Sequence, residues 1–97
     1  MNLKAIIQQP QITLIDVREP MEVFFGKAAD AVNIPLGTIP NRLDEIKEMT
    51  TPIVLYCRSG NRSAQAVQYL KAQGLTEVYD GGSLDNVRAL LNNKETV

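Results

Sequence analysis

The sequence predicts an α/β domain built on a largely parallel sheet, and three features lead to that prediction. Short apolar runs that favour β-strands alternate with amphipathic segments of helix length. The 97 residues, 44% of them hydrophobic, are enough for one core and too few for two. No repeat, low-complexity tract or flexible linker interrupts the chain. We therefore expect one domain over residues 1–97.

The strands are predicted from four short runs of β-favouring residues. The run at 53–56 is wholly apolar, as expected of a strand that is buried on both faces. The four predicted strands cover residues 12–17, 31–34, 53–56 and 77–79.

The first helices are predicted around these strands. A short helix is expected over residues 2–8, within an N-terminal segment of residues 1–10. Pro20 fits the first turn of a helix over 20–25, because the N–H that proline lacks has no partner there. Phe24 and Phe25 in this helix are expected to be core residues or to pack while partly exposed.

The next helix is predicted to begin at Thr38, a residue type that caps helix N-termini. Ile39, Leu43 and Ile46 then share one apolar face, and Pro52 ends the segment.

Two further helices have well-marked ends. One covers about residues 62–73, with Gly74 as a left-handed cap. Gly81–Gly82 can approach the active site, but a turn is the favoured interpretation, and Ser83 caps the last helix. Residues 92–97 are expected to fray.

The composition excludes several classes of function. Ten basic and eleven acidic side chains give a net charge of −1, so no nucleic-acid or membrane partner is expected. With no His and one Cys, the chain can form no Ser-His-Asp triad, Cys-His pair, Cys/His zinc site or internal disulfide. No metal and no cofactor is expected. No targeting signal is visible and the longest apolar run is only five residues, which favours a cytoplasmic location.

The single cysteine, Cys57, follows the predicted buried strand and precedes a tight loop and a helix. Ligands of open α/β sheets bind at the carboxyl ends of the strands, where Cys57 is expected to lie. A free thiol is only about 3% ionised at pH 7, and the thiolate is the nucleophile. Three effects can lower the pKa of this thiol: the charges of Arg58 and Arg62, the positive end of the following helix, and converging loop amides.

The loop after Cys57 also has the composition of an anion site. Gly60 lets the backbone adopt conformations closed to other residues, and Ser59, Asn61 and Ser63 add short polar side chains. Oxyanions bind at helix N-termini for the same reasons. The sequence therefore predicts a nucleophile inside an anion pocket.

Four ordered segments resemble the single-domain rhodaneses, or sulfurtransferases, and are similar to the small phage-shock type of bacteria. The resemblance covers nearly the whole chain and implies a parallel sheet of about five strands, flanked by helices on both faces. It rests on residues 14–20 (LIDVREP), 31–36 (AVNIPL), 56–63 (YCRSGNRS) and 80–82 (DGG).

The resemblance implies a double displacement. Cys57 takes a sulfane sulfur from thiosulfate or a similar anionic donor and holds it as a persulfide. A thiophilic acceptor such as cyanide, a thiol or a sulfur-accepting protein then removes it. The loop from Arg58 to Arg62 surrounds the sulfur, with Arg58 as the better candidate for steering the donor and Arg62 as partly structural. An ionised nucleophile needs no general base, so the absence of His is no obstacle.

Other interpretations remain open. The domain can be a persulfide carrier or a protein-binding module without turnover. A phosphatase is less favoured, because the similar cell-cycle phosphatases have one residue more between the cysteine and the arginine of this loop. Asp16 and Arg18 can support the site from behind it, although a structural ion pair is the favoured interpretation.

The chain departs from the family pattern at Lys27, Asp30 and Asn86. These departures bear on the packing around the second strand and the last helix and on the donor preference, but not on the nucleophile.

Overall fold

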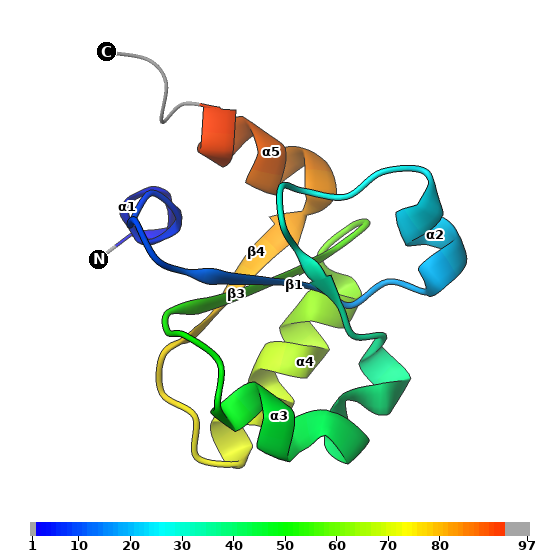
Figure 1. Ribbon diagram of the computed structural model, residues 1–97, viewed down its shortest axis with the longest axis vertical. Helices are drawn as coiled ribbons and strands as arrows, with labels where there is room; N and C mark the ends of the chain where they lie inside the picture. Colours follow the sequence, from blue (N-terminus) through cyan, green and yellow to red (C-terminus); the bar gives the residue numbers. More distant parts are fainter. Residues whose placement is uncertain (1, 93–97) are drawn as a thin grey trace.

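Four parallel strands form the centre of the computed structural model, which describes residues 2–92 (Figure 1). Their order across the sheet is β2-β1-β3-β4. The strands are β1 (Thr13–Asp16), β2 (Val32–Asn33), β3 (Ile53–Cys57) and β4 (Val78–Ser83). The four runs predicted from the sequence are thus confirmed. The count of about five was wrong for the described residues, because the segments outside these runs form helices and loops instead.

Helices cover both faces of the sheet, as expected. Figure 1 shows α1 (Leu3–Ile7) and α5 (Leu84–Asn92) on one side, with α3 (Leu43–Lys47) and α4 (Asn61–Ala72) on the other. Alternate residues of β3 serve the two layers: Val54 and Tyr56 pack in the core of the α1 and α5 side, whereas Leu55 and Cys57 pack in the other core. All five residues of β3 are buried. No helix within residues 2–92 has the length and apolar character needed to cross a bilayer.

The helix predicted from Thr38 differs in form. Residues Leu36–Arg42 make a 3₁₀ helix, η1, and the α-helix begins only at Leu43. Pro40 lies inside η1 and has no N–H to donate to an α-helical bond. Thr38 is not a cap, because its hydroxyl donates to the Pro35 carbonyl at 2.8 Å. The predicted apolar face is nevertheless present, since Ile39 and Ile46 are buried.

The turn predicted at Gly81–Gly82 was wrong: both residues lie within β4. Packing explains why glycine is needed there. A Cβ on Gly81 would lie 2.9 Å from side-chain methyls of both Val54 and Val87, so only a bare backbone passes between β3 and α5. The pairing of β3 with β4 shifts at Leu55/Tyr56, which brings Gly82 opposite Tyr56.

The predicted C-terminal end of α4 and the predicted N-terminal cap of α5 are confirmed. Gly74 has φ +100°, and the Leu75 N–H returns to the Leu70 carbonyl at 3.1 Å, as in a left-handed cap. Ser83 accepts a hydrogen bond from the Asn86 N–H at 3.0 Å and so caps α5. Asn92 is the last residue of α5, and the rest of the tail expected to fray, residues 93–97, lies outside the described residues.

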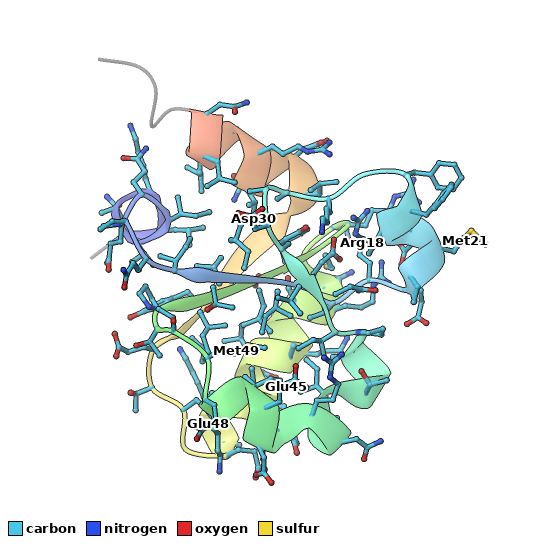
Figure 2. All side chains as sticks on the ribbon, viewed as in Figure 1. Arg18, Met21, Asp30, Glu45, Glu48 and Met49 are labelled. Atoms are coloured by element: carbon cyan, nitrogen blue, oxygen red, sulfur yellow. The ribbon has the colours of Figure 1, made fainter. Side chains whose placement is uncertain are left out.

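The short helix α2 (Pro20–Phe24) carries exposed apolar side chains. Of the two alternatives for Phe24 and Phe25, a place in the core was wrong, because they are 80% and 81% exposed. Met21 is 72% exposed and points away from the molecule in Figure 2. A helix of only five residues has little area to bury, and none of its residues is buried.

Candidate active site

The cysteine lies at the junction of a central strand and a helix. Cys57 is the last residue of β3, and α4 begins four residues later at Asn61. Gly60 turns the chain between them with φ +103°, a conformation that glycine adopts without strain. The turn brings the Gly60 N–H to 2.9 Å from the Cys57 sulfur, to which it donates a hydrogen bond. The local sequence therefore folds an amide back onto the thiol.

The Cys57 sulfur is fully buried and lies 3.6 Å from the Ser63 hydroxyl oxygen. Burial raises the pKa of the thiol, but hydrogen bonds outweigh this effect and leave the pKa below its ordinary value. They come from the backbone and side chain of Ser63 and from the amides of Gly60 and Ser59. Because the sulfur has no exposed surface, the loop or the side chain must move before a donor can reach it.

Arg62 is engaged in a two-armed ion pair with Glu22 of α2. Its terminal nitrogens donate to Glu22 Oε1 and Oε2 at 2.7 and 2.9 Å. Glu22 also accepts the Glu19 N–H at 2.8 Å, which closes a capping box at the start of α2. The hydrogen bonds from Arg62 and then from the Glu19 amide lower the pKa of Glu22 from 4.5 to about 2. Arg62 thus ties the beginning of α4 to α2.

This ion pair predicts a specific dependence of stability on pH. The pKa of Glu22 is lowered in the folded state, so the pair stabilises the fold above the unfolded pKa near 4.5 and this stabilisation is lost as the pH falls towards about 2. We expect Glu22→Gln to be less stable than the wild type near neutral pH and the difference to shrink in acid. Urea unfolding at about pH 6 and about pH 3 measures this.

Glu48→Gln is the matched control, because Glu48 is exposed on α3's C-terminal side and forms no ion pair within the described part of the chain. A Glu22→Gln variant whose stability difference does not change with pH would contradict the assignment.

Arg58 lies beside a pocket of about 420 Å³ next to the loop. Its guanidinium has no hydrogen bond or ion pair among residues 2–92 and is exposed. A free guanidinium favours binding of an anion. The other residues that line this pocket are Arg18, Met21, Glu22, Phe25, Leu84 and Asp85.

Asp16 and Arg18 form a buried ion pair at the end of β1. Arg18 donates to Asp16 Oδ2 at 2.7 Å through Nη2 and to Oδ1 at 2.9 Å through Nε. The same guanidinium donates to the Gly26 carbonyl at 2.6 Å, and Figure 2 marks its position beside α2. Neither side chain hydrogen-bonds the loop after Cys57 among the described residues.

The structure brings Ser59, Gly60 and Ser63 to the sulfur and leaves the Asn61 side chain exposed. Two residues that hold this arrangement were not predicted from the sequence as site residues. Asp80 accepts the Ser63 hydroxyl at 2.7 Å and the Gly82 N–H at 2.9 Å. Glu22 holds Arg62. A signal for Glu22 was available, since it stands three residues after Glu19 at a helix start.

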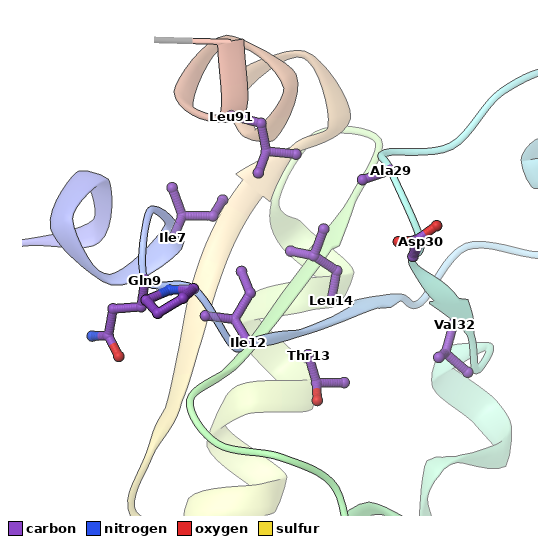
Figure 3. Close-up of a pocket in the computed structure, with 10 residues that line it drawn as sticks. Ile7, Gln9, Ile12, Thr13, Leu14, Ala29, Asp30, Val32 and Leu91 are labelled. Atoms are coloured by element: carbon purple, nitrogen blue, oxygen red, sulfur yellow. The ribbon is translucent and has the colours of Figure 1, made fainter. Parts of the chain in front are cut away.

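The three departures from the family pattern make no hydrogen bond to the Cys57 sulfur among the described residues. Asn86 donates to the Gly81 carbonyl at 2.7 Å and so joins α5 to β4. Lys27 donates to the Ala31 carbonyl at 3.4 Å. Asp30 lies at a separate pocket of about 380 Å³ between α1, β1 and β2 (Figure 3). That pocket includes no residue of the cysteine loop. Within residues 2–92, no three Cys, Asp or Glu side chains are grouped to hold a metal ion.

Comparisons with known proteins bear on this site. The family model described as "Rhodanese-like domain" matches residues 2–86. A sulfurtransferase of Allochromatium vinosum is 43% identical over 67 residues, which cover 69% of this chain and 62% of the relative. The chain spans between 47% and 62% of the length of three curated relatives.

Solved structures show the same fold. A rhodanese from E. coli, solved with anions, has a TM-score of 0.67 at 29% identity and covers 78% of this chain and 91% of its own. A protein from Staphylococcus saprophyticus has a TM-score of 0.70 at 31% identity and covers 88% of this chain and 85% of its own.

Proposed function

This chain belongs to the rhodanese-like domain family, and we propose that it transfers sulfane sulfur through a persulfide on Cys57. The observation that carries the proposal is the contact of the Gly60 amide with the Cys57 sulfur, 2.9 Å away at the carboxyl end of β3. This contact and the backbone amides of Ser63 and Ser59 favour a thiolate, which is the reactive form. The sulfurtransferase of A. vinosum supports the same class of reaction.

The reaction needs no other nucleophile. The Cys57 thiolate attacks the outer sulfur of thiosulfate, the S–S bond of the donor breaks, and sulfite leaves with the bonding electron pair. The enzyme then holds a persulfide with a charged outer sulfur. Cyanide or a thiolate acceptor attacks that sulfur, and the Cys57 thiolate leaves. Neither step has to transfer a proton to or from the protein.

We propose Arg58 as the group that attracts the anionic donor. Arg62 is neutralised by Glu22, whereas Arg58 is exposed and unpaired within the described residues. The structure of the E. coli rhodanese was solved with anions, which supports an anionic ligand for this kind of domain.

The expected result is a gain of one sulfur atom in the intact mass of the wild-type protein after treatment with thiosulfate. Cyanide should then restore the original mass and release thiocyanate. Because Cys57 is the only cysteine, the added sulfur has one thiol to occupy. Aryl phosphate serves as the control substrate and should not be hydrolysed. Protein that gains no sulfur from any donor would contradict the proposal.

A protein acceptor is the second candidate, and the exposed side chains of α2 favour it. Met21 and Phe25 line the pocket beside Arg58, and both are more than two-thirds exposed. Apolar side chains exposed together commonly mark a contact with another protein. A domain that takes up sulfur but releases none to cyanide or to small thiols would be a carrier for a protein acceptor.

A further inference from the structure

The Ser63 hydroxyl is fully buried and has more acceptors around it than hydrogens to donate. A hydroxyl donates one hydrogen and offers two lone pairs. Of the oxygen acceptors, the Asp80 carboxylate is the nearest and the only charged one, so it takes the hydrogen. The distances from Ser63 Oγ are 2.7 Å to Asp80 Oδ1, 3.0 Å to the Gly60 carbonyl, 3.5 Å to the Gly82 carbonyl and 3.6 Å to Cys57 Sγ.

This geometry suits a neutral thiol. The Cys57 thiol donates to the Ser63 oxygen, and Ser63 donates in turn to Asp80. A thiolate has no hydrogen to donate and is stabilised by receiving one. To give its hydrogen to the sulfur, the Ser63 hydroxyl must turn away from the carboxylate. The Asp80 carboxylate and the Cys57 thiolate therefore compete for the same hydrogen.

Asp80 is well placed to compete. The Gly82 N–H donates to the same carboxylate oxygen at 2.9 Å and fixes it beside Ser63. We propose that Asp80 is a positioning residue that acts through Ser63: its hold on the hydroxyl hydrogen decides how readily Cys57 becomes a thiolate. In this arrangement Asp80 favours the thiol, and the loop amides favour the thiolate.

The other charged groups around the sulfur are paired or lie at the pocket. Arg62 of α4 is neutralised by Glu22 of α2, and Arg18 is neutralised by Asp16 at the end of β1. Arg58 of the loop and Asp85 of α5 line the pocket together with Arg18 and Glu22. Glu19 lies close enough to Arg62 to raise the pKa of that guanidinium. Among the described residues, Asp80 is the acidic side chain linked to the sulfur through a single hydroxyl.

This competition fits the proposed function, on which its role in turnover rests. The Cys57 sulfur carries the negative charge when it is free and is neutral when it is bonded to a second sulfur. The hydroxyl turns to the sulfur in the first state and returns to Asp80 in the second. Asp80 thereby stabilises the loaded form relative to the free thiolate.

The test measures the ionisation of Cys57 without any sulfur transfer, so it stands apart from a failure of the proposed function. The rate of alkylation by iodoacetamide is followed against pH, and the midpoint reports the thiol because no other cysteine is present. We expect Asp80→Asn, which keeps an acceptor for the Gly82 N–H, to lower the midpoint by about half a pH unit. At pH values below the midpoint, this variant should then contain roughly threefold more thiolate than the wild type.

A double-mutant comparison identifies the route. Because Ser63 transmits the effect, Asp80→Asn should lower the alkylation midpoint much less in a Ser63→Ala background than in the wild type. Ser63→Ala should in turn shift the midpoint less in the wild type than in the Asp80→Asn background. Asp85→Asn, which removes the same charge from the neighbouring α5, should shift the midpoint less. The proposal is overturned if Asp80→Asn leaves the midpoint unchanged or raises it. The proposal is also overturned if Asp85→Asn shifts the midpoint as much as Asp80→Asn does, or if Asp80→Asn still lowers the midpoint fully when Ser63 is replaced by Ala. Circular dichroism checks folding, and Asp80→Ser replaces the Asn variant if that variant is unfolded.

Discussion

The Cys57→Ser variant is expected to gain no sulfur from thiosulfate while remaining folded. A hydroxyl is nearly the size of a thiol, and it can accept the Gly60 N–H that the sulfur accepts at 2.9 Å. The pKa of a serine hydroxyl lies far above that of a thiol, so no anionic nucleophile forms near neutral pH. We therefore expect complete loss of sulfur loading, with a stability change of about 1 kcal/mol or less. Intact mass and a urea unfolding curve on the same preparation measure the two effects.

A chemical control separates loss of the thiol from damage to the loop. Wild-type protein alkylated at Cys57 before treatment should also fail to gain sulfur, although its sequence is unchanged. A Cys57→Ser protein that gains one sulfur as the wild type does would show that the sulfur binds elsewhere, and the proposed mechanism would be wrong.

The position of the cysteine could be predicted because local pattern determines it. A wholly apolar run followed by a glycine-containing loop predicts a buried strand, a tight turn and a helix, and β3, Gly60 and α4 follow this order. The Ser83 cap and the Gly74 helix end were predictable for the same reason. In these cases the residue that determines the conformation lies within a few positions of the structure it makes.

Features that depend on distant contacts could not be predicted in this way. The Arg62–Glu22 pair joins residues 40 positions apart, and the Ser63–Asp80 bond joins residues 17 apart. Gly-Gly ordinarily signals a turn, but Gly81 is needed because Val54 and Val87 approach β4 from different elements. Phe24 and Phe25 are apolar, yet a pattern alone does not reveal that α2 buries none of its residues.

The largest expected loss of stability comes from Arg18→Met. This change leaves the Asp16 carboxylate, which has no exposed surface, without its counter-charge. Removing one partner of a buried ion pair typically costs about 3–5 kcal/mol. Urea unfolding near neutral pH measures this loss.

Two controls show whether the loss comes from the pair. Arg58→Met makes the same chemical change at an exposed arginine that has no ion pair among residues 2–92, and should cost about 0.5 kcal/mol or less. The double variant Asp16→Leu/Arg18→Met replaces both charges with apolar side chains and should recover most of the stability. An Arg18→Met protein as stable as Arg58→Met would contradict the importance of the pair.

The same variants distinguish a structural role of Asp16 and Arg18 from a direct role in sulfur transfer. Neither side chain hydrogen-bonds the loop after Cys57 within the described residues, although Arg18 lines the pocket beside Arg58. A purely structural pair predicts that the double variant, once folded, takes up sulfur at the wild-type rate. If it folds stably but loads sulfur at least tenfold more slowly, the charge of Arg18 contributes to donor binding together with Arg58. The thiosulfate concentration needed for half-maximal loading assigns that contribution. If Arg18 and Arg58 both bind the donor, this concentration should be raised in the double variant and in Arg58→Met alike.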